Sequence, residues 1–491
     1  DLSSALTDRD GELIAQGHDV PIHLGVMSYT VKEFLARVPR DRLRAGDVWI
    51  LNLPEIGGNH LPDVKIIRPI FAEDRLIAFS AQLAHWADIG GAAPGSYFAQ
   101  ATDAWMEGMR IPPTRIFVGD EPDAEKIALI LANVRGPRER EGDLMAQVAA
   151  ARIADTRLRD IAARHGVDTL RAAMAALHAR SEAQMRAAIL SLPDGVYEGI
   201  DHLDDGGPGN APVAIRVTVT ITGDEASFDF TASDDAIDGP LNTTRFVAGS
   251  AAFYTLKALA GPDIQSNGGC YRPLRIITRP GSVMDASPDK PVVGGNHETS
   301  LRAVDAIFKA LEPALGERMS AGGNTSSGLL IFSGPGRNGR WATFYEPHGG
   351  GEGARIDRDG MAVVRVHLTN VMNTPVEIIE SEYQLRVDRQ RLRHGSGGAG
   401  AHRGGDGQVR VYRVLADRMS LTTMFERRLI PPYGLRGGES GLPARVTLEH
   451  ADGRREELPG KANVMLGRDD VVIFETPGGG GYGAPAKGQS T

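Results

Sequence analysis

The sequence lacks several features that would point to other classes of protein. It contains one cysteine, Cys270, so no disulfide can form within the chain, and we expect a reducing, cytoplasmic location. No run of 18 or more apolar residues occurs, which argues against a membrane-spanning helix. Basic residues number 54 against 63 acidic ones, a net charge of −9, and they form no polybasic run. Nucleic acid and anionic membranes are therefore not expected as partners.

A nucleotide-binding loop is also missing. The phosphate-loop pattern G-x-x-x-x-G-K followed by Ser or Thr does not occur. Two stretches, 334–339 and 395–400, match G-x-G-x-x-G, but neither opens a helix after an apolar strand, so we attribute both to chance. Any nucleotide used by this protein would bind elsewhere, such as on another polypeptide.

Glycine is the abundant residue. The chain has 60 glycines in 491 residues while 41% of its residues are hydrophobic, which indicates many tight turns and close backbone approaches instead of disorder. This length is enough for two to four domains. The chain opens at Asp1 and not at methionine, so we expect an upstream piece to be missing from it.

Apolar patterns along the chain predict an α+β protein of several domains, with mixed and antiparallel sheets, glycine-rich loops and an inserted helical arm. Leu170, Met174 and Leu177 have helical spacing in a segment rich in Ala, Arg and Leu, so the helices are expected to pack as an antiparallel arm. Val213 to Ile221 alternate strictly, which predicts a half-buried strand. The expected regions are a β-rich region with little helix at 1–122, the helical arm at 123–195, an α+β region at 196–325 with strands from about 211 and helices at 245–259 and 300–311, and a mainly β region at 326–491.

Two short motifs carry the functional signal. Asn59-His60-Leu61-Pro62-Asp63 and Ala84-His85-Trp86-Ala87-Asp88 place two imidazoles and two carboxylates in glycine- and proline-containing loops that follow predicted strands. Imidazole and carboxylate together bind divalent metals while leaving room for water. We therefore predict a metal site at His60, Asp63 and His85; the alternative is that these side chains only hydrogen-bond to loop backbone. Asp88 is either a further ligand or the acceptor that orients a histidine, and we favour the acceptor.

Three other groups of residues are weaker candidates. Cys270 could be a nucleophile, but a lone thiol is more often small packing material. His297-Glu298 and Arg427-Arg428 lie in loops rich in glycine and proline. Such loops either face a cleft or carry solvated charges at the surface.

Taken together, the motifs resemble those of the hydantoinase B family. The matches occur in the expected order over nearly the whole chain. They are 52–64, Arg68-Pro69, 85–91, 239–242, 367–370, 373–377, 396–400, 402–405 and 477–483.

The resemblance implies a function shared between two subunits. The family contains B subunits of ATP-dependent N-methylhydantoinases and lactamases, the equivalent half of 5-oxoprolinases, and subunits of acetone and acetophenone carboxylases. It implies a hetero-oligomer with a hydantoinase A-like subunit that binds ATP and phosphorylates the carbonyl oxygen of a small cyclic amide. In the B subunit, water activated by a metal would then attack the phosphorylated substrate.

Carried over residue by residue, the family's metal ligands fall on His60, Asp63 and His85, with Asp1 as a fourth. The resemblance implies one divalent metal, Mn, Zn or Fe. Asp88 is expected to orient a histidine or to act as general base.

His297, Glu298 and Arg427 are expected to line the substrate cavity. The chain has Leu53 where the family usually has Asp, which puts a standard hydantoinase activity in doubt. Two alternatives therefore stay open: a ketone carboxylase subunit in which an enolate attacks carboxyphosphate, and a scaffold subunit without chemistry. The chain is shorter than the carboxylase alpha subunits, which favours the cyclic amide hydrolases.

Overall fold

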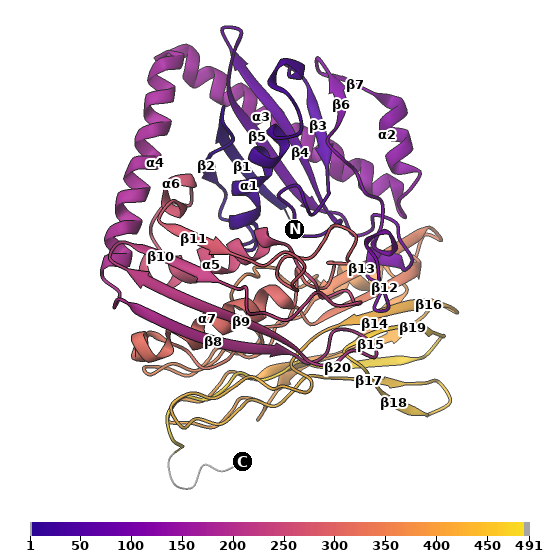
Figure 1. Cartoon of the computed structure of the whole chain (residues 1–491). Coiled ribbons are helices and arrows are strands. Elements are labelled where there is room, and N and C mark those ends of the chain that lie inside the picture. Colours follow the sequence, from indigo (N-terminus) through magenta and orange to yellow (C-terminus); the bar gives the residue numbers. More distant parts are fainter. Residues whose placement is uncertain (1, 486–491) are drawn as a thin grey trace.

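A computed structural model describes residues 2–485, and its N-terminal layer is a seven-stranded antiparallel sheet (Figure 1). The strand order is β2-β1-β5-β4-β3-β6-β7. β4 and β5 are the long central strands, joined by a tight turn in which Glu73 and Asp74 both have positive φ. The bounds are β1 Leu2–Asp8, β2 Leu13–Gln16, β3 Val48–Leu51, β4 Asp63–Ala72, β5 Arg75–His85, β6 Thr114–Val118 and β7 Glu121–Pro122.

Three helices follow this sheet: α2 (Ala124–Leu131), α3 (Pro137–His165) and α4 (Val167–Leu190). The predicted helical segment is confirmed, but its packing as an antiparallel arm is wrong. Figure 1 shows α3 running across the sheet and α4 descending along the side of the molecule. The reason is burial: α3 carries Leu144 and Val148 into one core with the strands, and Leu158 into another.

One helix was missed in the region where strands and loops were expected. α1 (His23–Leu35) is buried along most of its circumference, with Val26, Met27, Val31 and Phe34 fully covered. A helix that is covered on nearly all sides lacks the polar stripe that makes helical periodicity readable.

The middle layer is a four-stranded sheet in the order β11-β10-β9-β8, packed against helices. The predicted strand at 213–221 and the helices at 245–259 and 300–311 are confirmed. Strands return before the predicted residue 211. The additional strand is β8, which contains two glycines and precedes β9. Gly199 in β8 lies against the backbone of α7, where a Cβ would collide with the carbonyl of Ala306. The bounds are β8 Gly195–Leu203, β9 Val213–Thr222, β10 Glu225–Asp229, β11 Leu274–Ile277, α5 Arg245–Ala260, α6 Gly268–Tyr271 and α7 Thr299–Leu315.

The C-terminal layer consists of two further sheets and one short helix, with a core of its own around Phe332, Phe344, Tyr412 and Phe474. The sheet orders are β13-β12-β16-β19 and β14-β15-β20-β17-β18. The bounds are β12 Leu329–Pro335, β13 Trp341–Pro347, α8 Val376–Glu382, β14 Leu385–Arg393, β15 Gly407–Val414, β16 Met419–Met424, β17 Arg445–Glu449, β18 Arg455–Leu458, β19 Lys461–Leu466 and β20 Val471–Glu475. The predicted α+β fold with several antiparallel sheets is thus confirmed.

Much of the glycine lies in a bundle of extended segments at 349–354, 396–407, 433–442 and 477–483, here called the glycine bundle. The N–H groups of Gly478, Gly479, Gly480 and Gly481 donate in turn to the carbonyls of Leu442, Gly405, Gly322 and Glu439. Gly478 and Gly481, three residues apart, both donate to the segment 433–442. A three-residue repeat of this kind matches a polyproline II-like chain, whereas a β-strand repeats every two residues. The stretch 395–400 belongs to this bundle, which explains its glycines without a nucleotide.

The other G-x-G-x-x-G stretch, 334–339, spans the turn between β12 and β13. Cys270 is buried in α6. Among residues 2–485, no helix combines the length and the hydrophobicity that crossing a membrane would take.

Candidate metal centre

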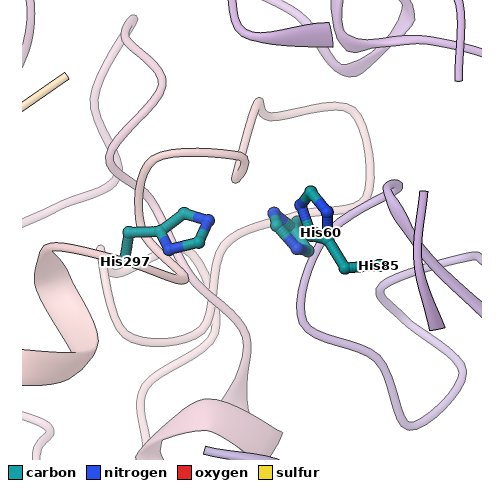
Figure 2. Close-up of side chains that lie close together, drawn as sticks. All are labelled: His60, His85 and His297. Atoms are coloured by element: carbon teal, nitrogen blue, oxygen red, sulfur yellow. The ribbon is translucent and has the colours of Figure 1, made fainter. Parts of the chain in front are cut away.

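Three histidines from distant parts of the chain converge at the interface between the first two layers. His60, His85 and His297 each offer a ring nitrogen, and these nitrogens lie within 4.8 Å of one another. Figure 2 shows the His297 ring pointing from one side toward the His60 and His85 rings. His60 and His297 are buried, and His85 is half-buried. The cluster therefore joins two predicted ligands to a residue that had been expected only to line a cavity.

The β-sheet register places Asp63 next to this cluster. Asp63 opens β4 and His85 ends β5, and the two are direct partners across the hairpin. Asp63 Oδ1 lies 3.1 Å from His60 Nε2, while Asp63 Oδ2 accepts a 2.9 Å hydrogen bond from Asn59. Burial alone would raise the pKa of Asp63, but His60, His23 and His85 hold it well below its usual value. The carboxylate is therefore ionised, as a metal ligand must be.

Two histidines of the cluster, His85 and His297, are neutral. Burial lowers the pKa values of His85 and His297 well below the usual range, and His60 adds to both shifts. His60 Nδ1 lies 3.3 Å from the carbonyl of Val293, and this contact turns Nε2 toward the Asp63 carboxylate and the Asn296 amide, which lies 3.3 Å away. His85 Nε2 is buried without a hydrogen-bond partner in the described chain. Three imidazoles beside one ionised carboxylate, with the His85 nitrogen unpartnered, fit a divalent cation.

The loop that carries His60 is held by an amide. Asn52 donates to the carbonyls of Leu61 (2.9 Å) and Met109 (2.8 Å) and accepts from the N–H of Ile111 at 2.6 Å. Leu53, where the family usually has Asp, instead packs against the apolar core and is half-buried. The backbone support of the loop therefore comes from Asn52.

Two tyrosines complete the polar surface and were not found from the sequence. The hydroxyls of Tyr97 and Tyr345 (3.1 Å) contact His297 Nε2, and Ser327 Oγ lies 3.2 Å from His297 Nδ1. Burial raises the pKa values of both tyrosines, so both hydroxyls stay protonated. Tyr97 follows a short 3-10 turn and Tyr345 lies in β13, so no local motif links them.

Asp88 borders the cleft that reaches His85, and it holds a loop. Its carboxylate accepts hydrogen bonds from the N–H groups of Gly90 (2.8 Å), Gly95 (2.8 Å) and Arg135 (3.1 Å), and from the Arg135 guanidinium at 3.2 Å. Within residues 2–485 it forms no hydrogen bond to a histidine. This loop leads to Tyr97, so Asp88 positions that side chain. The other predicted ligand, Asp1, lies outside the described residues.

Glu298 and Arg427 occupy different places. Glu298 Oε1 accepts from the N–H of Ser327 at 3.1 Å, and burial, with Glu426 nearby, raises the Glu298 pKa to about 8. Arg427 lies in a separate buried ion network, 2.5 Å from Asp305 and 3.2 Å from Asp201. Glu298 thus holds the backbone of Ser327, and neither Glu298 nor Arg427 is among the residues that line the cavities reaching the histidines.

Two connected hollows give access to the histidines. An outer cleft of about 390 Å³ lies between the start of α3 and β13 and reaches His85. A small inner hollow of about 20 Å³ continues past His85 and shares Pro347 and Val371 with the cleft. Its polar lining is His23, Asp63, His85, Asn296, His297, Ser300, Arg365 and Thr369.

Glu107 offers a test of how the His297 turn is positioned. Its buried carboxylate accepts from the N–H groups of Val292 (3.0 Å) and Val293 (2.8 Å), just before His297. We expect Glu107→Ala to weaken metal binding about 10- to 100-fold, the usual effect of removing a group that orients a ligand. Metal titration of purified protein would measure this, with exposed Glu125→Ala as the control. Glu107→Gln retains one acceptor and should fall between the two; unchanged affinity in Glu107→Ala would contradict the role.

Comparisons with known proteins agree with this fold. The chain belongs to the hydantoinase B/oxoprolinase family, whose family model matches residues 1–485. It is 36% identical to an uncharacterised Methanocaldococcus jannaschii protein, over 99% of this chain and 84% of that protein. It is 32% identical to 5-oxoprolinase 1 of Arabidopsis thaliana, again over 99% of this chain. The chain spans only 39% of that 5-oxoprolinase.

Subunits of known enzymes are also similar. The caprolactamase subunit beta of Pseudomonas jessenii is 31% identical over 99% of this chain and 85% of that subunit. The crystal structure of the ATP-dependent caprolactamase from the same organism matches with a TM-score of 0.91 at 28% identity, over 99% of this chain and 85% of that one. An acetone carboxylase structure matches with a TM-score of 0.89 at 19% identity, over 99% and 71% of the two chains, which establishes a shared fold.

Proposed function

We propose that this chain is the B-type subunit of an ATP-dependent hydrolase of cyclic amides. In this proposal the three clustered histidines and Asp63 hold one divalent metal, Mn, Zn or Fe, and Asp1 remains a candidate for a further ligand. The observation that carries the proposal is the convergence of three imidazoles beside an ionised carboxylate at the end of a cleft. The substrate is a small molecule of the hydantoin, lactam or oxoproline kind.

The chemistry needs activation because resonance stabilises the carbonyl group of a cyclic amide. Phosphorylation of the carbonyl oxygen, using ATP on a hydantoinase A-like subunit, creates an imidate phosphate that water can attack. A bound divalent metal supplies acidity, lowering the pKa of water from 15.7 toward about 7. The protonated hydroxyls of Tyr97 and Tyr345 donate hydrogen bonds to oxygen atoms that gain charge. The narrow inner hollow limits the access of bulk water.

Several observations support a partner subunit. The similar caprolactamase chain is named subunit beta, and this chain spans most of its length. The sequence contains no phosphate loop of its own. The 5-oxoprolinase relatives are longer and leave more than half of their length outside the match. Each of these fits an ATP-binding half on another polypeptide and a hetero-oligomeric enzyme.

Elemental analysis tests the metal assignment. Wild-type protein is expected to contain close to one divalent metal per chain, and a His60→Ala/His85→Ala double variant about a tenth of that or less, because two of the four donors are removed. Circular dichroism on the same samples would establish that both proteins are folded. Equal metal content in the two proteins would contradict the assignment.

A ketone carboxylase subunit is the second candidate, and the shared fold with acetone carboxylase favours it. ATP turnover that depends on bicarbonate and a ketone, in the complex with the A-type subunit, would decide for carboxylation. A metal-free chain that still forms an intact complex would instead support a scaffold role.

A further inference from the structure

Arg365 is a half-buried cation beside the histidine cluster that the proposed function does not use. It lines the inner hollow together with Asn296 and His297. Among residues 2–485 it has no carboxylate within ion-pair distance, whereas the buried Arg302, Arg410 and Arg427 each have at least one. A charge removed from water without a countercharge is costly. Glu298 and Glu346 act on this charge from beyond ion-pair distance, so no carboxylate of residues 2–485 pairs with it directly.

The hydrogen bonds of Arg365 leave one edge of the guanidinium free. Nη1 donates to the Ser327 carbonyl at 3.0 Å and Nη2 lies 3.4 Å from Ser327 Oγ, so Ser327 occupies the end of the group. Nε is buried and has no partner in the described chain. The side edge, formed by Nε and one Nη, is the fork that binds two oxygens of a carboxylate or phosphate at once.

The backbone around Arg365 is held in an unfavourable conformation. Val363 and His367, two residues to either side, have φ values of 53° and 56°, a region that costs non-glycine residues about 1–3 kcal/mol each. Hydrogen bonds between Val364 and Gly350 fix the segment on one side, and the bond from Ile22 to Leu368 fixes it on the other. Strain of this kind persists where the surrounding structure fixes a functional group in place.

Charge balance indicates the kind of ligand. Asp63 and Arg365 are the only carboxylate and guanidinium side chains among the residues that line the inner hollow, and histidines bind a metal as neutral imidazoles. Their charges cancel, so a divalent metal in the site of the proposed function leaves an excess of two positive charges. A dianion balances that excess, and a singly charged carboxylate does not.

We propose that Arg365 binds the phosphoryl group of the activated substrate, using the free side edge of its guanidinium next to the histidine cluster. This inference rests on the proposed function, because the phosphorylated cyclic amide is its ligand. It assigns to Arg365 the task of placing the phosphorylated carbon at the cluster, and it makes the site selective for a dianionic tetrahedral group.

Calorimetric titration of the full-length, metal-loaded chain with inorganic phosphate tests the inference. Loss of a charge-assisted, two-point contact should weaken phosphate binding about 10- to 100-fold in Arg365→Gln. Arg365→Lys keeps the charge without the fork and should lie in between. The control is Arg355→Gln, because Arg355 lines the adjoining cavity with Arg365 but is 42% exposed. The phosphate affinity of this variant should stay within about twofold of the wild-type value.

Every outcome bears on Arg365. Equal phosphate affinity in Arg365→Gln and wild type, or no phosphate binding by wild type, overturns the inference. A loss in Arg355→Gln as large as in Arg365→Gln moves the anion to the adjoining cavity, and acetate binding as tight as phosphate binding overturns the selectivity for a dianion. Thermal unfolding of the same variants shows whether they are folded, and Arg365→Lys provides the test if Arg365→Gln is not.

These measurements distinguish a failure of the proposed function from a failure of the inference about Arg365. Metal content, determined on the same samples, reports on the histidine cluster, whereas the ratio of phosphate affinities between variants reports on Arg365. A metal-free wild type would contradict the proposed function, and a loaded protein indifferent to Arg365→Gln would contradict only the present inference.

Discussion

Replacing His297 with alanine should weaken binding of a divalent metal by at least about 100-fold, more than is typical for removing a residue that only orients a ligand. Three of the four proposed donors would remain, His60, His85 and Asp63, and a divalent cation loses much of its affinity when one protein ligand is removed. Competition with a metal-binding dye on the purified chain would measure the change. The same variant should lose catalytic activity in the complex with the A-type subunit.

This prediction separates two sets of ligands. The sequence alone placed the metal on residues near the N-terminus, whereas the structure adds His297 from the turn before α7. His402→Ala, which removes a partly exposed histidine in the glycine bundle, is the matched control and should bind metal like the wild type. If His297→Ala retains wild-type affinity and fold, the ligand set is confined to the first 85 residues.

Replacing Gly479 with alanine should destabilise the protein by at least about 4 kcal/mol, a size reserved for a few severe mechanisms. Gly479 lies inside the glycine bundle, where its N–H donates to Gly405 and its carbonyl accepts from Gly398. A Cβ would fall deep inside the van der Waals radius of the Glu352 carbonyl oxygen, which is backbone and cannot rotate away. Since whole domains are stable by only about 5–15 kcal/mol, we expect little soluble, folded protein.

The same substitution elsewhere should have the opposite sign. Gly142 is exposed in α3, and a Cβ there would meet nothing within 4 Å. Alanine has the higher helix propensity, so Gly142→Ala should stabilise the protein by about 0.5–1 kcal/mol. Denaturant unfolding of both variants would measure the two effects. A Gly479→Ala protein as stable as wild type would show that the bundle is looser than the structure describes.

The sequence alone predicted more of the local structure than of its packing. Helical spacing around Leu170 and alternation from Val213 to Ile221 identified α4 and β9, because each exposes one polar face. α1 escaped prediction because it is buried almost all round, and the packing of α3 on the sheet depends on surfaces that no single segment contains. Propensity and periodicity are local, whereas docking is not.

The candidate site divides in the same way. The motifs at 59–63 and 84–88 already contained His60, Asp63 and His85. They meet in space because the hairpin places the start of β4 beside the end of β5. Only the tertiary structure joined His297 to them, placed the hydroxyls of Tyr97 and Tyr345 on His297, and left Arg365 beside the cluster with no direct ion pair among residues 2–485. The sequence thus determined which chemistry was present near the N-terminus. Packing between separate layers decided which distant groups share that space, because burial and not sequence spacing brings them into contact.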